Sequence, residues 1–259
     1  MNKIDKRAVI EENVTLGDNV EISPYAIIKS GAVIGDNCSI GSGVIIGNNT
    51  IMGKNNKFFS YSAIGEIPQD LKYHGEKATL EIGDNNTFRE FVTINIGTEN
   101  GGGVTKIGNS NLFMAYTHVA HDCIIGNSNI FSNLASLSGH IIVGNNVGVG
   151  GMSGIHQFVN LGDYSFIGGG SMVTLDVAPY SLVAGNRATL SSANLIGLKR
   201  KGFTPEQIDR IKSVFRIFFR SKLTKEEAIA KIEKEVELTE EVTFFLDFVK
   251  HSSERGICR

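Results

Sequence analysis

Four of the six histidines in the chain lie between residues 118 and 156, and one of them is followed directly by an aspartate. They are His118, His121, His140 and His156, and Asp122 is next to His121. An imidazole changes its charge near neutral pH, and a neighbouring carboxylate can tune it as a base. The set therefore suits general-base catalysis by one histidine, with the other histidines binding an anionic substrate.

A metal site or a purely structural role would use the same residues. A zinc site needs three imidazoles that meet at one metal, and the spacing from His118 to His121 is too common in proteins to establish one. The structural alternative is that each histidine lies at a corner of the chain and hydrogen-bonds to the backbone. For any single histidine this alternative is the better explanation. We favour the general base because the histidines occur as a set.

An apolar residue recurs every six positions, and this period indicates how the histidines come together. The first run is Ile10, Leu16, Ile22, Ile28, Ile34, Ile40, Ile46, Met52, Phe58 and Ile64. The register returns at Ile82, Phe88 and Ile94, and again at Ile107, Phe113, Val119, Ile125, Phe131, Leu137, Val143, Val149, Ile155, Leu161, Ile167 and Val173. Such a period fits neither an α-helix nor an alternating strand, and it predicts a parallel β-helix built from hexapeptide repeats.

Each turn of this coil takes three hexapeptides, so residues eighteen apart should stack. Gly often follows the apolar residue, and Asn, Asp or Ser commonly comes next; these residues suit corners, where positive φ is cheap for Gly and Asn. The hand of the coil, left, is that of the hexapeptide-repeat family, because spacing alone does not determine it. The fold class expected is thus a left-handed parallel β-helix, an all-β coil, with a C-terminal α-helical domain.

Wrapping the chain in this way stacks the chemical residues along one edge. Ala120-His121-Asp122 lies beneath Ser138-Gly139-His140, which lies beneath His156-Gln157-Phe158. Neighbouring turns are about 4.8 Å apart. The backbone N–H of Gly139, one turn above His121, could therefore stabilise an oxyanion during acyl transfer.

The hexapeptide pattern is interrupted twice and then ends. Residues 65–81 and 95–106 leave the coil, and segments that leave a regular scaffold tend to carry function. The pattern stops after Val173, and from about Asn194 the period becomes helical, with capping-box starts at Thr204 and Thr224 and a third helix beginning at Thr239. We expect the β-helix to cover residues 1–186 and the helical domain to cover residues 187–259.

Composition narrows the function. The net charge of −2 argues against a nucleic-acid partner. Polar residues and glycines break the longest apolar runs, so we expect no integral membrane association, and no signal peptide is visible. The three cysteines show no metal or redox spacing, which is typical of a cytoplasmic protein with reduced thiols.

At these residues the sequence resembles the acyl-carrier-protein-dependent UDP-N-acetylglucosamine O-acyltransferases that begin lipid A biosynthesis. The resemblance covers essentially the whole chain. The motifs that carry it are Ile64-Gly65-Glu66, Gln69-Asp70-Leu71-Lys72-Tyr73, Gly101-Gly102-Gly103, His118-Val119-Ala120-His121-Asp122-Cys123, His156-Gln157-Phe158, Gly185-Asn186-Arg187-Ala188-Thr189 and Gly197-Leu198-Lys199-Arg200-Lys201-Gly202-Phe203.

The resemblance implies a role for each site residue. His121 would be the general base, assisted by Asp122, and the N–H of Gly139 would hold the oxyanion. Sugar, diphosphate and nucleotide would be bound by Asp70, Lys72, His118, His140, His156, Gln157, Arg187, Asn194, Arg200 and Lys201. Gly169 would act as a ruler at the end of the acyl groove and favour a 3-hydroxymyristoyl chain.

The resemblance also implies partners: an acyl carrier protein thioester as the donor substrate, a UDP-amino sugar as the acceptor, and a homotrimer with its active site between subunits. It implies no cofactor and no metal. Three alternatives remain open from the residues. The acceptor could be a 3-amino UDP-sugar, the coil could serve as a structural or assembly scaffold, and a zinc-dependent lyase or hydratase could use the histidines.

Overall fold

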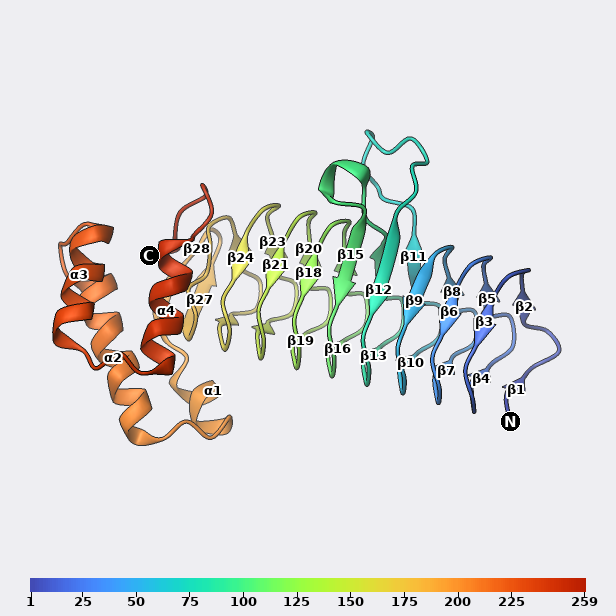
Figure 1. Cartoon of the computed structure of the whole chain (residues 1–259), viewed down its shortest axis with the longest axis horizontal. Helices are drawn as coiled ribbons and strands as arrows, with labels where there is room; N and C mark the ends of the chain where they lie inside the picture. The colour runs from blue at the N-terminus through green and yellow to red at the C-terminus, as the bar shows by residue number, and fades with distance from the viewer.

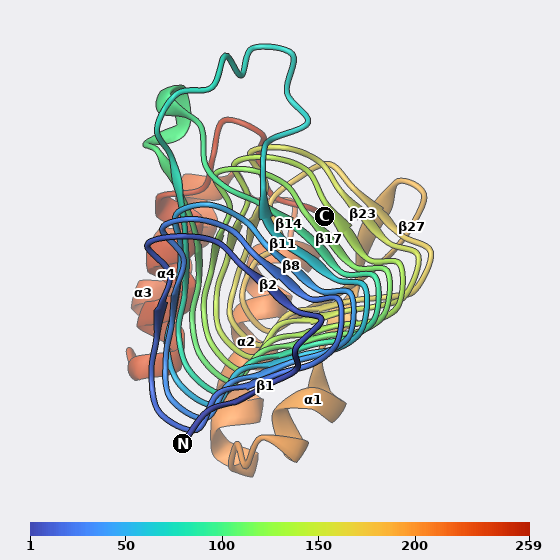
Figure 2. The same cartoon turned by 90° about the vertical axis from the view of Figure 1, so that its right-hand side faces the viewer.

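The computed structural model describes residues 1–259 and shows a long left-handed parallel β-helix followed by a helical tail (Figure 1). Short strands from successive turns build three sheets, parallel except for the last strand pair of the first sheet, and these enclose a triangular core (Figure 2). The fold expected from the six-residue period is confirmed.

The strands are as follows. The first sheet contains, in order, β1 (Lys3–Ile4), β4 (Glu21–Ile22), β7 (Ser39–Ile40), β10 (Lys57–Phe58), β13 (Thr87–Phe88), β16 (Leu112–Phe113), β19 (Ile130–Phe131), β22 (Gly148–Val149), β25 (Phe166–Ile167), β27 (Ser181–Gly185) and β28 (Ala188–Ala193). The second contains β2 (Val9–Ile10), β5 (Ile27–Ile28), β8 (Ile45–Ile46), β11 (Ala63–Glu66), β14 (Thr93–Asn95), β17 (His118–Val119), β20 (Ser136–Leu137), β23 (Gly154–Ile155) and β26 (Met172–Val173). The third contains β3 (Thr15–Leu16), β6 (Val33–Ile34), β9 (Thr50–Met52), β12 (Thr79–Ile82), β15 (Val104–Ile107), β18 (Ile124–Ile125), β21 (Ile142–Val143) and β24 (Asn160–Leu161).

The apolar residue of each hexapeptide points into the coil and stacks on its equivalent one turn away. Val119 pairs with Leu137, and Leu137 pairs with Ile155, which confirms the eighteen-residue register. Four phenylalanines form a continuous column inside the coil, with ring centroids 4.7–4.9 Å apart: Phe58, Phe88, Phe113 and Phe131. Residues two positions after Val119, Leu137 and Ile155 therefore also recur at one edge, and this places His121 and Gly139 in neighbouring turns.

The corners differ from the expectation in one respect. Most of the glycines that follow the apolar residue have ordinary negative φ, and they are needed because the next turn comes close. A Cβ at Gly126 would lie 2.6 Å from the carbonyl oxygen of Gly144. Positive φ occurs instead further into each corner, at asparagines such as Asn37 but also at aromatic residues such as Tyr116 and Phe158. Close packing between turns, more than backbone conformation, explains the repeated glycine.

Two segments leave the coil, as expected (Figure 1). The first excursion, residues 67–78, joins β11 to β12, and the second, residues 96–103, joins β14 to β15 and contains the short helix η1 (Glu99–Gly101). Both leave from the edge between the second and third sheets, in two consecutive turns of the coil. They therefore project on the same side, as Figures 1 and 2 show.

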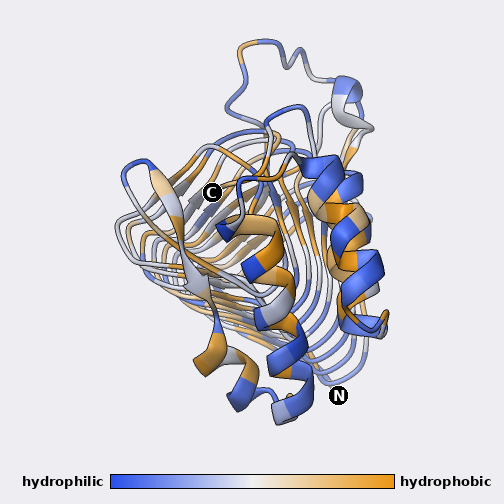
Figure 3. Cartoon of the chain, turned by 90° about the vertical axis from the view of Figure 1, so that its left-hand side faces the viewer, coloured by the Kyte–Doolittle hydropathy of each residue, from blue (hydrophilic) through white to orange (hydrophobic).

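The tail begins with the hairpin β27–β28 and continues in four helices, α1 (Leu195–Arg200), α2 (Pro205–Arg220), α3 (Lys225–Glu235) and α4 (Glu240–Lys250). Thr204 and Thr224 form the capping boxes that were predicted, whereas Thr239 precedes α4 without a side-chain cap. The helices lie across the end of the coil (Figure 3) and share a second apolar core with its last residues, among them Ala178 and Tyr180. The boundary between the coil and the helical domain at residue 186 stays a prediction. Strand β28 follows this boundary but still pairs with β27 of the first sheet.

Two further observations bear on the environment of the chain. No helix is both long enough and apolar enough to cross a membrane. Cys38, Cys123 and Cys258 are all free thiols and all buried. Burial raises the pKa of the Cys123 thiol to about 12, so this residue next to the site is a poor nucleophile.

Candidate active site

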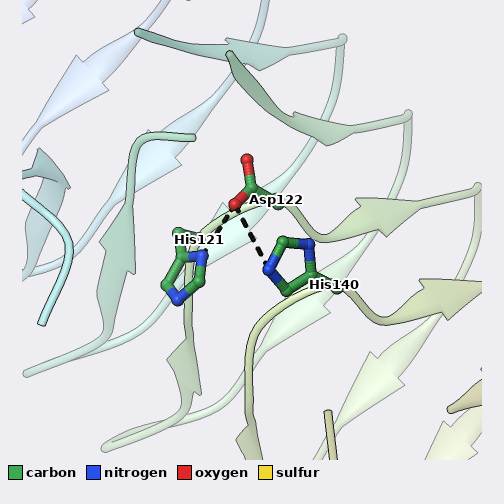
Figure 4. A group of neighbouring side chains, drawn as sticks. All are labelled: His121, Asp122 and His140. Atoms are coloured by element: carbon green, nitrogen blue, oxygen red, sulfur yellow. Dashed lines mark hydrogen bonds and ion pairs between the residues drawn. The ribbon is translucent and has the colours of Figure 1, made fainter. Parts of the chain in front are cut away.

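His121 and Asp122 lie in the tight corner that joins β17 to β18, at the edge from which the two excursions leave one and two turns earlier. Asp122 and His140 occupy equivalent positions in consecutive turns, and both have positive φ, 60° and 59°. This conformation turns both side chains toward His121, as Figure 4 shows. The eighteen-residue period thus brings together the residues that the sequence placed at one edge.

The orientation of the His121 ring follows from its partner. Nδ1 lies 2.7 Å from Asp122 Oδ2 (Figure 4). Because a carboxylate can only accept, Nδ1 carries the proton and Nε2 is left with a free lone pair. The side chain of His121 is 14% exposed, so Nε2 is available to a substrate from a largely desolvated ring.

Asp122 is shielded completely, with a side chain that is 0% exposed. A buried carboxylate needs several donors, and the second excursion supplies two of them. The backbone N–H of Thr98 donates to Oδ1 at 2.8 Å, and the Thr98 hydroxyl donates to Oδ2 at 2.6 Å. The hydroxyl of Thr105 accepts the backbone N–H of Asp122 at 2.8 Å. Neither threonine was expected from the sequence: Thr98 lies in an excursion that no period connects to the corner, and Thr105 lies on β15 outside every motif considered.

The first excursion reaches the same corner. Asp70 Oδ2 lies 3.9 Å from Nε2 of His121, and its other oxygen accepts the backbone N–H of Lys72 at 3.0 Å. Lys72 lies close enough that its charge acts on His140. Both residues of the predicted loop motif are therefore part of the site, although they are some fifty residues away in sequence.

His140 forms the other wall. Its ring lies edge-on to His121, with centroids 5.1 Å apart, and it stacks on Phe158 at 4.6 Å. Burial lowers its pKa, an effect that the nearby Asp122 carboxylate opposes. Phe158, the last residue of the His156-Gln157-Phe158 motif, supports this imidazole from one turn above.

The remaining two histidines lie at the margins. His118 is on β17, and its Nδ1 lies 2.8 Å from the hydroxyl of Thr93 on the preceding turn. Burial lowers the pKa of His118, and the neighbouring His121 lowers it further. His156 is exposed, and its Nδ1 is 3.3 Å from the carbonyl oxygen of the equally exposed Gln157. The structure records no contact between His156 and the other histidines.

Gly139 is the residue that lets the rings fit. A Cβ at this position would lie 2.7 Å from Cε1 of His121, so only glycine allows the imidazole to pack there. Its backbone N–H donates no hydrogen bond within the chain. An unengaged amide on the residue that packs against the His121 imidazole is free to donate to a ligand.

Four predicted binding residues lie elsewhere, near the C-terminal end of the coil. Arg187 is exposed in the turn between β27 and β28, and Arg200 and Lys201 are at the end of α1. Asn194 caps that helix, since its Oδ1 accepts the N–H of Gly197 at 3.1 Å and its Nδ2 donates to the carbonyl oxygen of Tyr164 at 2.9 Å. From β16 to β27 there are four strand spacings, which amounts to about 19 Å. One chain alone does not bring these residues to His121.

A metal remains a chemical alternative at the corner. Ligand atoms of His121, Asp122 and His140 lie within 4.8 Å of one another. The set contains two imidazoles and one carboxylate, whereas the zinc site considered from the sequence required three imidazoles. In this arrangement Asp122 Oδ2 already accepts from Thr98 and His121. A metal would have to displace those bonds.

Comparison with known proteins gives a consistent result. The family model described as UDP N-acetylglucosamine O-acyltransferase, domain 2, matches residues 176–258. The acyl-[acyl-carrier-protein]–UDP-N-acetylglucosamine O-acyltransferase of Sulfurovum sp. (strain NBC37-1) is 48% identical over 257 residues, 99% of this chain and 98% of that protein. The protein of the same name from Aliarcobacter butzleri (strain RM4018) is 50% identical over 219 residues, 85% of this chain and 84% of that one.

Solved structures agree with these relatives. The UDP-N-acetylglucosamine O-acyltransferase (LpxA) of Moraxella catarrhalis RH4 superimposes with a TM-score of 0.96 at 41% identity, and 99% of each chain is covered. The UDP-N-acetylglucosamine acyltransferase of Campylobacter jejuni gives a TM-score of 0.94, also at 41% identity and with 99% of each chain covered.

Proposed function

The chain belongs to the family of acyl-[acyl-carrier-protein]–UDP-N-acetylglucosamine O-acyltransferases, which act in the first step of lipid A biosynthesis, and we propose that it carries out this transfer at the corner that holds His121. The donor is a 3-hydroxyacyl thioester of acyl carrier protein, and the acceptor is the 3-hydroxyl of UDP-N-acetylglucosamine. One observation carries the assignment of the site: an imidazole with a free Nε2 packs against Gly139, whose backbone N–H has no partner in the chain.

The reaction needs one proton to move twice. Nε2 of His121 takes the proton of the sugar hydroxyl while that oxygen attacks the thioester carbonyl carbon and forms the new C–O bond. Asp122 stabilises the imidazolium that results. The N–H of Gly139 holds the oxyanion of the tetrahedral intermediate. When the intermediate collapses, the C–S bond breaks, and the imidazolium returns its proton to the departing thiolate of the carrier protein.

The polar groups around Nε2 suit a sugar diphosphate. Asp70 faces Nε2 of His121 from the first excursion, so the hydroxyl that donates to Nε2 and a second hydroxyl of the sugar that donates to Asp70 could bind side by side. Lys72 and His140 add positive or hydrogen-bonding groups beside it. Arg187, Asn194, Arg200 and Lys201 lie about 19 Å away along one chain, so we assign them to the nucleotide bound by a neighbouring subunit.

A homotrimer is supported by an apolar column along another edge of the coil, the one between the first and second sheets. Gly43 interrupts it in the turn that ends in β8, and in the other turns it consists of the residue two positions before a strand of the second sheet: Tyr25, Tyr61, Phe91, Tyr116, Leu134 and Met152. These side chains are 43–67% exposed in the single chain. Exposed apolar surface of this extent typically marks an interface.

Acyl carrier protein would dock on the tail. A groove between β28, α1 and α2 is lined by Leu190, Ala193, Leu195, Phe215 and Phe219, and its rim carries Lys212, Arg216 and Arg220. An apolar groove with a basic rim fits an acidic carrier. Since carrier thioesters and nucleotide sugars are cytoplasmic metabolites, we place the enzyme in the cytoplasm.

The test is an acyl-transfer assay of the purified protein with UDP-N-acetylglucosamine, its 3-amino analogue and a panel of carrier thioesters. We expect the 3-hydroxyl sugar to be acylated, and His121→Ala to lower kcat at least about 100-fold without unfolding the coil, because a positioned base contributes that much. His121 lies outside the apolar columns, so its removal opens no core cavity. A variant that keeps more than about a tenth of wild-type kcat would show that His121 is not the base, and transfer only to the 3-amino sugar would change the acceptor.

A further inference from the structure

The second excursion returns to the site through a single residue. Thr98, which is 5% exposed, binds Asp122 with both its backbone N–H and its hydroxyl. We infer that Thr98 is a positioning residue of the acyl transfer: it holds the Asp122 carboxylate in the rotamer that keeps His121 Nδ1 protonated and Nε2 aimed at the substrate. This inference rests on the general-base role proposed for His121.

The carboxylate has a choice of partners, and this is why it needs to be held. Oδ2 lies 2.7 Å from Nδ1 of His121, but it is also only 3.7 Å from Nε2 of His140. The terminal torsion of an aspartate is broad, so a modest rotation would move Oδ2 from one imidazole toward the other. The N–H of Thr98 fixes Oδ1, and its hydroxyl fixes Oδ2. Together they leave His121 as the partner at hydrogen-bonding distance.

The direction of the Thr98 hydroxyl bond is also determined. A carboxylate accepts only, so the hydroxyl must donate, and the structure gives it no other partner. With His121 and the Thr98 amide, three donors surround a carboxylate that no water reaches. A bond to a charged, buried acceptor is stronger than one between neutral groups. Thr98 therefore contributes to holding the Asp122 carboxylate in its orientation.

The three consecutive glycines of the second excursion hold the backbone of Thr98 in position. The N–H groups of Gly101 and Gly103 both donate to the carbonyl oxygen of Thr98, at 3.0 and 2.8 Å. Gly102 and Gly103 have positive φ, 97° and 78°. Gly101 lies directly against Asp122, and a Cβ there would overlap its carboxylate. The glycine motif thus closes the loop onto Thr98 and covers the aspartate.

The experiment compares Thr98→Val with Thr98→Ser. The valine variant keeps the backbone bond and the shape but loses the hydroxyl, and we expect its kcat to fall about 10- to 100-fold. Its KM for the nucleotide sugar should stay within about twofold, because Thr98 does not touch substrate. Thr98→Ser restores the donor and should recover most of kcat. Thr98→Ala answers the same question if the valine variant does not fold.

Two further readouts separate positioning from stability. Thr117 is a fully buried threonine of the same turn as His121, and its hydroxyl bonds to the carbonyl oxygen of Met114 at 2.7 Å. Thr117→Val is the matched control, which should lower Tm by a similar amount but leave kcat close to wild type. With one donor lost, Asp122 becomes a stronger acceptor for a protonated imidazole. The acid-side fall of kcat/KM in Thr98→Val should therefore move to higher pH.

The outcomes distinguish this inference from the proposed function. If His121→Ala is inactive but Thr98→Val retains wild-type kcat and an unchanged pH profile, the positioning role is wrong and the base stands. If Thr98→Val loses no more activity than Thr117→Val, Thr98 only supports the fold. If His121→Ala stays active, the proposed site itself fails. In an Asp122→Asn background the Thr98→Val substitution should cost little more, since it acts through Asp122.

Discussion

The length of the acyl chain should depend on Gly169, and the structure shows that this position can be tested without damage to the coil. Gly169 is exposed between β25 and β26. A Cβ there would lie 3.4 Å from the carbonyl oxygen of Gly151, which is ordinary contact. Its neighbours are less tolerant, because Gly170 has a φ of 69° and a Cβ at Gly168 would lie 2.9 Å from that of Ala184. We therefore expect Gly169→Met to fold.

The distance along the coil fits a ruler between two chain lengths. Along the coil axis, three strand spacings separate β16, in the turn of His121, from β25, which amounts to about 14 Å. His121 lies at the edge between the second and third sheets and Gly169 at the edge between the first and second, so in this prediction the groove runs between the His121 edge of one subunit and the Gly169 edge of a neighbour. With carbon–carbon bonds of about 1.52 Å at angles near 111°, an extended chain advances about 1.25 Å per carbon. Ten carbons then reach about 11 Å from the thioester carbonyl, and fourteen reach about 16 Å. A methionine at Gly169 would meet the longer chain and miss the shorter one.

The size of the effect follows from burial. Four additional methylenes contribute about 3 kcal/mol if all are buried, or roughly 200-fold in kcat/KM in favour of the fourteen-carbon donor. In Gly169→Met that gain is lost, and overpacking costs about 1–3 kcal/mol more. The preference should therefore invert toward 3-hydroxydecanoyl, while kcat for this short donor stays near wild type.

The assay is a competition between 3-hydroxymyristoyl and 3-hydroxydecanoyl carrier thioesters, with the acylated sugars separated by mass. Gly169→Ala provides the intermediate size and should shift the ratio only in part. If the wild-type enzyme prefers the ten-carbon donor, or if Gly169→Met lowers both rates equally, then Gly169 does not measure the chain.

Two further predictions concern docking and pH. Charge reversal at Arg216 and Arg220 should raise KM for the carrier thioester and make this KM less dependent on salt. Steady-state kinetics at several ionic strengths would measure both effects. If KM does not change with the charge reversal or with salt, these arginines belong to a solvated helix face and do not bind the carrier. The free energy of unfolding should fall as the pH drops below 6.5, the ordinary pKa of histidine. Burial lowers the pKa of His118 and of His140 in the folded chain. In this pH range the unfolded chain therefore binds more protons than the folded one, and protonation favours unfolding. Chemical denaturation on both sides of pH 6.5 should give a slope of at most about 1.4 kcal/mol per pH unit for each histidine, and His118→Gln should remove part of it.

The coil could be predicted from the sequence because one apolar residue in every six marks each repeat. Every inward position must be apolar, and every turn repeats the demand, so Val119 and Leu137 reveal their stacking without any structure. The pairing of His121 with Gly139 followed from the same count. The aromatic residues at positive φ were not foreseen, since stacking between turns compensates a conformation that the residues alone disfavour.

Thr98 could not be found in this way. Its two bonds to Asp122 depend on the closed shape of an excursion that has no period, and a threonine among polar residues carries no signal of its own. Asn194 shows the opposite case. The family resemblance gave it a nucleotide role, and the structure shows that its side chain already caps α1, so any ligand contact must coexist with two internal hydrogen bonds.

The placement of the excursions explains why the site lies at this corner and not at another of the many equivalent ones. A plain hexapeptide coil exposes the same shallow edge in every turn, and an imidazole on it would face water. Here three consecutive turns use the edge between the second and third sheets for three purposes: the first excursion supplies Asp70, the second supplies Thr98, and the third turn supplies His121 and Asp122. The excursions thus cover the corner and bury the Asp122 carboxylate, while the His121 ring stays partly exposed. A repeat provides the spacing, and the interruptions of the repeat provide the desolvated environment in which a histidine can act as a base.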